Sequence, residues 1–190
     1  HLPVAEGGEQ VGVTHHELPY YGPLAQWVEK GELDFVQVHY SIHTRQAEER
    51  ILPATLDKGV AVLVNMPFEK ARLFKIVEGQ PLPGFAKEIG CKNWAQFFLK
   101  WVISHPAVTV AIPATTNPDH QTENIGALRG PLPDPAMRAR MARTCEAIAG
   151  GQGTENREAA HQYSVLTEYL NKYSRSGSRP RMPQAGQSPA

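Results

Sequence analysis

The sequence predicts an α/β fold that is built from parallel βα units. Short runs rich in β-branched and aromatic residues alternate with amphipathic helical stretches, an order typical of parallel strands joined by crossover helices. The four strand-like runs cover residues 10–14, 35–40, 60–65 and 108–113. Glycine follows the first two helical stretches and marks their ends, which supports the same interpretation.

The number of units favours one parallel architecture over the other. The continuous apolar run of residues 60–64 predicts a strand covered on both faces, as in doubly wound sheets and in barrels. No glycine-rich dinucleotide fingerprint follows the first strand, which disfavours a doubly wound sheet. A complete TIM-type barrel takes about 250 residues and eight βα units. We therefore predict that residues 1–150 form half of a (β/α)8 barrel, with four βα units.

Four helices are predicted from their end signals and apolar stripes. The first covers residues 24–30, and the second begins at an N-cap, Thr44, and ends before Gly59. Asn93 caps the third helix, and the fourth begins at Pro118. Their apolar stripes consist of Leu24, Trp27 and Val28; Ala47, Ile51, Leu52 and Leu56; Phe97, Phe98, Trp101 and Val102; and Ile125 with Leu128.

The pattern changes after Asp134. Asp134 is expected to cap a helix that carries Met137, Met141 and Ile148, and the glycine-rich segment 150–153 is expected to break it. Residues 151–175 are predicted to form a helical extension with Tyr163, Tyr169 and Tyr173 along one side. Residues 176–190 are rich in Ser, Gly, Pro and Gln without periodicity, which predicts a disordered tail.

The composition excludes some classes of function. The 190 residues contain 19 basic and 19 acidic side chains, so the chain lacks the charge excess that binding to nucleic acid or a membrane surface requires. No apolar run approaches the length of a bilayer span, and no signal-like segment precedes the first strand, so a cytoplasmic location is expected. Two cysteines are too few for a disulfide scaffold and are expected to be free thiols.

The segment 112–124 (IPATTNPDHQTEN) is the most informative stretch of the chain. It closes an apolar strand, turns through small polar residues and opens a helix at Pro118. A strand end that leads into a helix N-terminus presents free backbone N–H groups and the positive end of the helix dipole. The segment therefore predicts a binding site for a phosphate group.

Five motifs in fixed order resemble the C-terminal half of the aldo-keto reductases. They are Gly12-Val13-Thr14 and the segments 34–41, 60–68, 94–101 and 112–124, and the resemblance covers about residues 8–145. It identifies the four strands as the fifth to eighth of that family's barrel. It implies a nicotinamide nucleotide as cofactor, NADP first, with NAD as an alternative.

The resemblance also implies which residues contact the nicotinamide end of the cofactor. Gln37 matches the glutamine that holds the nicotinamide amide, and Thr14 and His15 stand where the family carries Ser-Asn. Asn65 stands where an aromatic residue often stacks on the nicotinamide ring, and Phe68 is a substitute for that ring.

At the adenosine end, Thr115 matches a phosphate-contacting serine, and Glu123 and Asn124 match residues that contact adenine. Asn117 and His120 occupy positions where many members carry Lys or Arg. Without those fixed positive charges, selectivity for the 2′-phosphate of NADP is expected to be weak.

The family's catalytic Asp, Tyr, Lys and His come from its second to fourth strands, and no segment of this sequence matches them. The candidates at strand ends are His15, Glu17, His39, Tyr40 and Glu69. His15 with His39 or His43 allows acid–base chemistry, but no complete metal-ligand set is present, so no metal is expected. Tyr40 is either a proton donor or a packed, hydrogen-bonded residue.

Other charged residues are expected to have structural roles or to allow a different chemistry. Glu17 and Glu69 are the two carboxylates on which a hydrolase of the glycosidase type would depend. Asp34, at the start of its strand, is expected to orient a turn, and the charges of residues 48–50 are expected to form a solvated helix face.

Three functions remain open at this point. The first is a truncated or remodelled aldo-keto reductase relative that keeps part of an NADP(H) site and whose activity would be NADP-dependent carbonyl reduction. The second is a non-catalytic binding or assembly module, and the third is a hydrolase. A four-stranded parallel half barrel has two unpaired edges, and symmetric pairing of two copies satisfies both. We therefore expect a homodimer or a higher oligomer.

Overall fold

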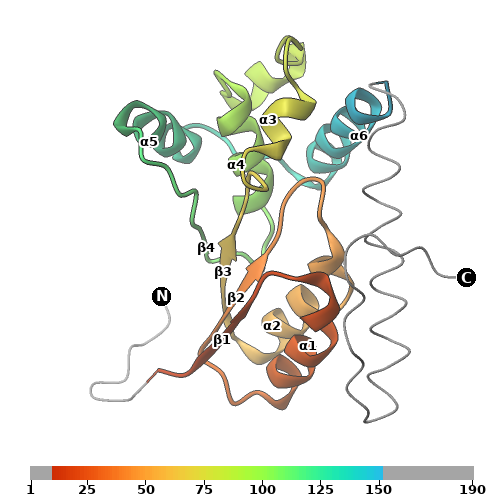
Figure 1. Cartoon of the computed structure of the whole chain (residues 1–190), viewed down its shortest axis with the longest axis vertical. Coiled ribbons are helices and arrows are strands. Elements are labelled where there is room, and N and C mark those ends of the chain that lie inside the picture. Colours follow the sequence, from red (N-terminus) through yellow and green to blue (C-terminus); the bar gives the residue numbers. More distant parts are fainter. Residues whose placement is uncertain (1–9, 152–190) are drawn as a thin grey trace, which may run out of the picture. The chain divides into compact units, whose positions relative to one another are not determined.

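The computed structural model describes residues 10–151, in which four parallel strands form one sheet in the order β1-β2-β3-β4 (Figure 1). The strands are β1 (Gly12–His15), β2 (Phe35–His39), β3 (Ala61–Asn65) and β4 (Val110–Ala111). β2, β3 and β4 lie within their predicted runs, whereas β1 extends one residue beyond its run, to His15. The parallel order confirms the half barrel of four βα units.

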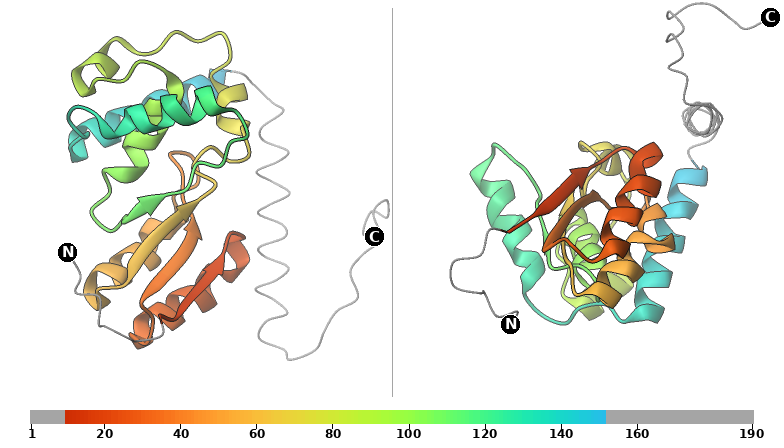
Figure 2. Two further views of the ribbon diagram at one scale, coloured as in Figure 1. Left: turned by 90° about the vertical axis from the view of Figure 1, so that its left-hand side faces the viewer. Right: turned by 90° about the horizontal axis from the view of Figure 1, so that it is seen from below.

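Helices connect and flank the strands. The α-helices are α1 (Tyr21–Lys30), α2 (Ile51–Lys58), α3 (Arg72–Ile76), α4 (Trp94–Ile103), α5 (Pro118–Ile125) and α6 (Pro135–Gly151). Short 3-10 helices precede α1, α2 and α4 and follow α5; they are η1 (Leu18–Tyr20), η2 (Gln46–Glu49), η3 (Gly84–Ile89) and η4 (Gly126–Leu128). Helices α1 and α2 lie side by side against one face of the sheet (Figure 2).

The core lies between the sheet and these helices. Val36, Val38, Val62 and Val64 point to the helical side and are fully buried. The predicted aromatic stripe of α4 joins the same core through Phe97, Phe98 and Trp101, all of which are buried. Burial of each such side chain contributes about 1.5–3 kcal/mol, so this face supplies most of the hydrophobic stabilisation of the half barrel.

The opposite, inner face of the sheet corrects one expectation. Residues 60–64 were predicted to be covered on both faces, but β3 alternates, with Val62 and Val64 buried and Ala61 and Leu63 half-buried. The reason is that the four strands described form an open sheet. The strands that would face it across a closed barrel are not among residues 10–151, so alternate side chains stay in contact with solvent.

Two of the three predicted caps are confirmed. Asn93 Oδ1 accepts a hydrogen bond from Gln96 N at 2.9 Å, and Asp134 Oδ1 accepts one from Met137 N at 2.7 Å. The third prediction is wrong: α2 begins at Ile51, and the Thr44 hydroxyl donates to the buried carboxylate of Glu69 instead. The Thr44 hydroxyl, which the neighbouring sequence predicted to cap a helix, is therefore bonded to a carboxylate that is distant in sequence.

Several side chains predicted to face the core are exposed. Trp27 is 47% exposed and Leu56 is 53% exposed, and Ile125 and Leu128 also lie at the surface. The apolar stripes of α1, α2 and α5 are thus narrower than their sequences indicated. The ammonium group of Lys30 lies over the Trp27 ring at 4.1 Å from its centre, which partly explains how the indole is accommodated at the surface.

The structural roles of the charged residues are mixed. Asp34 accepts a hydrogen bond from Val11 N at 2.7 Å, which confirms that it orients the chain at the start of β2. Glu48 is not part of a solvated face as predicted, because it accepts hydrogen bonds from Tyr40 and Arg138. Both cysteines are free and buried, as predicted, and burial raises the pKa of Cys91 to about 11.

Other expectations concern the C-terminal part of the chain. Helix α6 continues over Gly150 and Gly151, so the predicted break does not begin at Gly150. The predicted helix with Tyr163, Tyr169 and Tyr173 and the tail 176–190 lie outside the described residues. Within residues 10–151, no helix has the length and apolar character required to cross a membrane.

The Asn93 cap allows a direct test of this part of the fold. Asn93→Ala removes the acceptor for an N-terminal amide of α4 and is expected to lower the free energy of unfolding by about 1 kcal/mol. Asn93→Asp keeps an acceptor and should retain most of that stability. Urea titrations followed by circular dichroism measure both variants, and equal midpoints for Asn93→Ala and the parent chain would contradict the capping role.

Candidate functional site

The polar side chains at the carboxyl ends of the strands share the inner face of the sheet. Parallel register pairs Thr14 with Gln37, and His39 with Asn65 one row further along. Because side chains alternate along a strand, these four residues point to the same side. The structure therefore brings together Thr14, Gln37 and Asn65, three of the predicted nicotinamide contacts.

His15 lies on the opposite face of β1. Its ring stacks on Tyr20 with 4.0 Å between ring centres, and its Nδ1 accepts a hydrogen bond from Glu17 N at 3.1 Å. It is therefore separated from Thr14 by the strand itself. Of the pair that stands for the family's Ser-Asn, only Thr14 faces the same side as Gln37.

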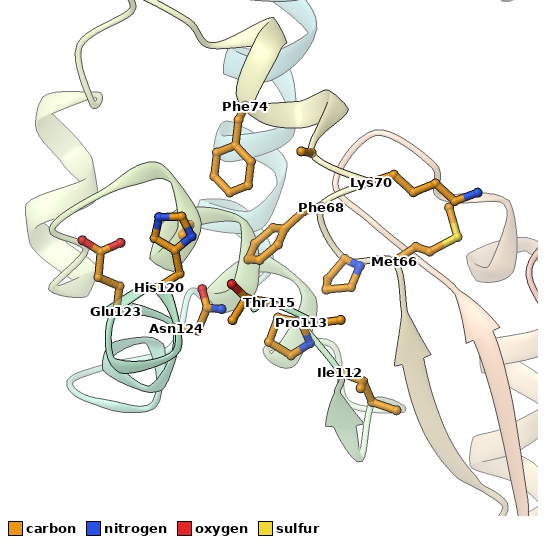
Figure 3. Close-up of a pocket in the computed structure, with 14 residues that line it drawn as sticks. Met66, Phe68, Lys70, Phe74, Ile112, Pro113, Thr115, His120, Glu123 and Asn124 are labelled. Carbon is orange, nitrogen blue, oxygen red and sulfur yellow. The ribbon is translucent and has the colours of Figure 1, made fainter. Parts of the chain in front are cut away.

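A groove of about 610 Å³ lies beside the ends of β3 and β4 (Figure 3). Its walls come from two segments, residues 66–74 after β3 and residues 112–124 after β4, together with Ala95 of α4. Five predicted cofactor contacts line it: Phe68, Thr115, His120, Glu123 and Asn124. The groove also contains apolar residues that were not predicted from the sequence as contacts, among them Met66 and Phe74.

The N-terminus of α5 forms one end of this groove. Asn117 does not line it but caps the helix, since its Oδ1 accepts from Asp119 N at 2.9 Å. The backbone N–H of Asn117 donates to Thr115 Oγ1 at 3.1 Å, and this hydrogen bond orders the turn that precedes the helix. The predicted strand, turn and helix N-terminus are thus present, with the geometry that favours an anion.

This end of the groove has little fixed positive charge. Residues 112–124 contain no lysine or arginine. Lys70 lines the groove, but its ammonium group is directed away from Thr115 and His120 (Figure 3). The attraction for an anion here therefore comes from backbone N–H groups and the helix dipole.

Phe68 supplies an aromatic ring to the groove, and Asn65 does not. The Phe68 ring points toward Thr115 and Asn124 (Figure 3). It packs against Phe74 at 5.0 Å between ring centres, and Phe74 packs on Phe98 of the core at 5.8 Å. This chain of aromatic contacts packs the Phe68 ring against the core.

The loop after β3 has an unusual backbone. Met66, Glu69, Lys70 and Ala71 all have positive φ, between 51° and 69°, and none is glycine. A left-handed conformation costs a non-glycine residue roughly 1–2 kcal/mol. Such a loop persists only where its surroundings hold it in place.

Glu69 lies at the centre of a buried polar cluster behind this loop. Its carboxylate accepts hydrogen bonds from Ser41 Oγ at 2.5 Å, Thr44 Oγ1 at 2.6 Å and Arg72 Nε at 2.8 Å. Burial opposes ionisation, but these two hydroxyls and the guanidinium outweigh it and hold the pKa of Glu69 below its usual range. The carboxylate is therefore charged at neutral pH.

His39 faces this cluster without a hydrogen bond from Nε2, which lies 3.9 Å from Glu69 Oε1. Burial lowers the pKa of His39, and the Glu69 charge only partly offsets this effect. The ring is therefore neutral at pH 7. His43, at 3.8 Å from the same oxygen, is more exposed, and its Nδ1 lies 2.9 Å from Arg72 Nη2.

The catalytic candidates do not converge on one point. His39 and Glu69 are neighbours, whereas Tyr40 points to the helical side, where its buried hydroxyl donates to Glu48 and accepts from Arg138. Burial raises the pKa of Tyr40, so the packed interpretation describes this residue. Glu17 is exposed, and both oxygens of Glu69 already accept hydrogen bonds.

This arrangement gives a hydrolase no pair of available carboxylates. Among the described residues, no group of three or more His, Cys, Asp or Glu side chains is placed to hold a metal ion.

The buried carboxylate predicts an acid dependence of stability. Because the pKa of Glu69 is lower in the folded chain than its ordinary value of about 4.5, its contribution is complete above that value and is lost as pH falls through the folded pKa. Glu69→Gln is expected to cost about 2 kcal/mol at pH 7. The difference between the two chains should shrink below pH 4.5, and urea titrations at pH 7, 5 and 4 measure it. A constant difference across this range would contradict the assignment.

Comparisons with known proteins agree with this geometry. A model of the aldo/keto reductase family matches residues 10–142. The chain is 25% identical over 138 residues to the NADH-specific methylglyoxal reductase of Escherichia coli (strain K12), a match that covers 58% of this chain and 42% of that protein.

Solved structures give the same result. An aldo/keto reductase from Klebsiella pneumoniae in complex with NADP and acetate is similar with a TM-score of 0.54 and 25% identity, over 71% of this chain and 47% of that one. The thermostable aldo-keto reductase Tm1743 shares the fold with a TM-score of 0.52 and 20% identity, over 73% of this chain and 48% of that one. The chain thus spans less than half the length of these relatives. Since the family match extends over most of the residues that the structure describes, the chain belongs to the aldo/keto reductase family.

Proposed function

We propose that this chain binds a nicotinamide adenine dinucleotide in the groove between the loops that follow β3 and β4, and that it serves NAD(P)-dependent carbonyl reduction. The observation that carries the proposal is the position of Phe68, Thr115, His120, Glu123 and Asn124, which are far apart in sequence and line one groove. The Klebsiella pneumoniae relative was solved with NADP, and the Escherichia coli relative is NADH-specific.

The groove suggests a role for each part of the nucleotide. Glu123 and Asn124 contact the adenine base, and Thr115 with the N-terminus of α5 receives the phosphate groups. Phe68 provides an apolar surface in the middle of the groove. Gln37, Asn65 and Thr14, on the inner face of the sheet, contact the nicotinamide amide.

We propose further that the site discriminates weakly between NAD and NADP. Recognition of a 2′-phosphate usually depends on a bidentate arginine or a lysine, and residues 112–124 contain neither. Asn117 is engaged in capping α5, and His120 lines the groove without a guanidinium or ammonium group beside it in residues 112–124.

The reduction step itself needs groups that this sequence does not match by motif, since the family resemblance assigns the catalytic Asp, Tyr, Lys and His to other strands. We therefore propose that this chain contributes the cofactor-binding half of the reaction. A nucleotide-binding module without turnover is the second candidate, and it is favoured by the same observation.

Calorimetric titration with NADH and NADPH tests the binding proposal. We expect dissociation constants in the micromolar range for both, within about tenfold of each other. Thr115→Ala combined with Glu123→Ala removes one phosphate contact and one adenine contact, and should weaken binding about tenfold or more.

The matched control changes the same residue types outside the groove, Thr144→Ala with Glu32→Ala, and should bind like the parent chain. No heat with either nucleotide would contradict the proposal. Binding without reduction of aldehydes or ketones would favour the non-catalytic module.

We also propose that the chain self-associates through the inner face of the sheet. Val110, which pairs with Leu63 on this face, and Ile112 are 44% and 42% exposed, and β1 and β4 each have one unpaired edge in the described sheet. Exposed apolar side chains and free edges are usually covered by another chain or element.

Light scattering at micromolar concentration should find a dimer or a larger assembly, because pairing covers both edges. Val110→Lys with Ile112→Lys is expected to shift the chain to the monomer, since two charges on the inner face oppose its burial. A monodisperse monomer of the parent chain would contradict self-association.

A further inference from the structure

The loop from Met66 to Ala71 has a strained backbone and lies beside the groove. Four of its six residues have positive φ without being glycine. Its backbone bonds are short-range turns: Glu69 N donates to Met66 O at 2.9 Å, Arg72 N to Glu69 O at 3.1 Å, Leu73 N to Phe68 O at 3.4 Å and Phe74 N to Ala71 O at 3.2 Å. None of these bonds ties the loop to another strand or loop, and a strained segment persists only where an anchor in its surroundings holds it.

The Glu69 side chain provides this anchor. One carboxylate oxygen accepts from the hydroxyls of Ser41 and Thr44, and the other accepts from the guanidinium of Arg72. The Ser41 hydroxyl oxygen also accepts from Thr44 N at 2.8 Å, so the turn that receives Glu69 is itself ordered. The loop after β3 is thereby tied to the loop after β2 and to the start of α3.

The same loop forms one wall of the groove. Met66, Pro67, Phe68, Lys70 and Ala71 all line it. Glu69 is the one residue of this stretch that does not, because its side chain points to the opposite side of the loop, toward Ser41. The residues that line the groove (Figure 3) and the residue that anchors them thus belong to one strained segment, and Glu69 is directed toward Ser41 and Thr44 instead of the groove.

The histidines near Glu69 do not contribute to the anchor. His39 Nε2 and His43 Nδ1 lie 3.9 and 3.8 Å from Glu69 Oε1, beyond hydrogen-bond distance. Two hydroxyls and one guanidinium therefore provide all the hydrogen bonds that Glu69 accepts through its side chain in the described structure.

We propose that Glu69 is a positioning residue of the nucleotide groove: its carboxylate, bonded to Ser41, Thr44 and Arg72, holds the loop of residues 66–71, four of which are left-handed, in the conformation that presents Phe68 to the ligand. The identity of the ligand rests on the proposed function, whereas the anchoring does not. Glu69 acts through the loop and does not touch the nucleotide.

Hydrogen exchange of the full chain without ligand tests the anchor by itself. In Glu69→Gln, amides of residues 66–74 should exchange about tenfold faster than in the parent chain, because a neutral amide cannot replace the ion pair with Arg72. The control Glu49→Gln makes the same change at an exposed site and should leave these amides unchanged. Unchanged exchange in Glu69→Gln would overturn the proposal.

Nucleotide titration tests the link to the groove. Glu69→Gln should weaken NADH binding about tenfold, and Ala71→Gly added to it should restore much of the affinity and protection, because glycine adopts positive φ at no steric cost. A general loss of stability would not be rescued by glycine. Faster exchange with unchanged affinity would overturn the positioning role. If the parent chain binds no nucleotide, the proposed function fails, and the exchange experiment still decides the anchor.

A second pair of variants reaches the anchor from the other loop, in case Glu69→Gln does not fold. Ser41→Ala and Thr44→Val each remove one hydroxyl that donates to Glu69. Each should raise exchange in residues 66–74, although the substitutions lie more than 20 residues away in sequence. Protection of that segment equal to the parent chain in both variants would overturn the proposal.

Discussion

The parallel pairing of β2 with β3, in the register that sets His39 beside Asn65, is the constraint on which the rest of this structure depends. Because both strands end at the same edge, the loops that follow them leave the sheet side by side. A carboxylate on one loop can then reach hydroxyls on the other, as Glu69 reaches Ser41 and Thr44. A shift of one residue would turn Gln37 and His39 to the helical side and separate these partners.

Signals that act over a few residues predicted most of the fold, and contacts between distant residues account for the differences. The four strands and the Asn93 and Asp134 caps depend on neighbouring residues, so the sequence was sufficient for them. Thr44 was assigned to a helix end because its actual partner, Glu69, is 25 residues away. The resemblance predicted Phe68 and Thr115 as cofactor contacts, and both line the groove, but positive φ at four non-glycine residues leaves no mark in the sequence.

Charge is distributed unevenly between the groove and the region behind it. The buried, ionised Glu69 and its guanidinium partner lie behind the loop, where they act on the backbone. The groove itself combines the Phe68 ring, a helix N-terminus without lysine or arginine, and His120. A nucleotide in this groove would therefore be held by backbone N–H groups and by shape more than by ion pairs, which are the interactions that distinguish a 2′-phosphate from a hydroxyl.

The inner face of the sheet connects assembly with chemistry. Its row at the carboxyl ends of the strands is polar and contains His39 and Asn65. The next row combines Thr14 and Gln37 with Leu63 and Val110, and the lowest row contains Phe35 and Ala61. The inner face thus becomes more apolar away from the carboxyl ends, as in a filled barrel, in which side chains from all strands exclude water below the site. With four strands, Phe35, Gln37 and Leu63 stay half-exposed, and water reaches the place where a nicotinamide ring would lie. Hydride transfer requires a site from which water is excluded. Reduction therefore requires that another chain or element covers the inner face. The groove beside α5 needs no such cover, because residues of this chain form all of its described walls.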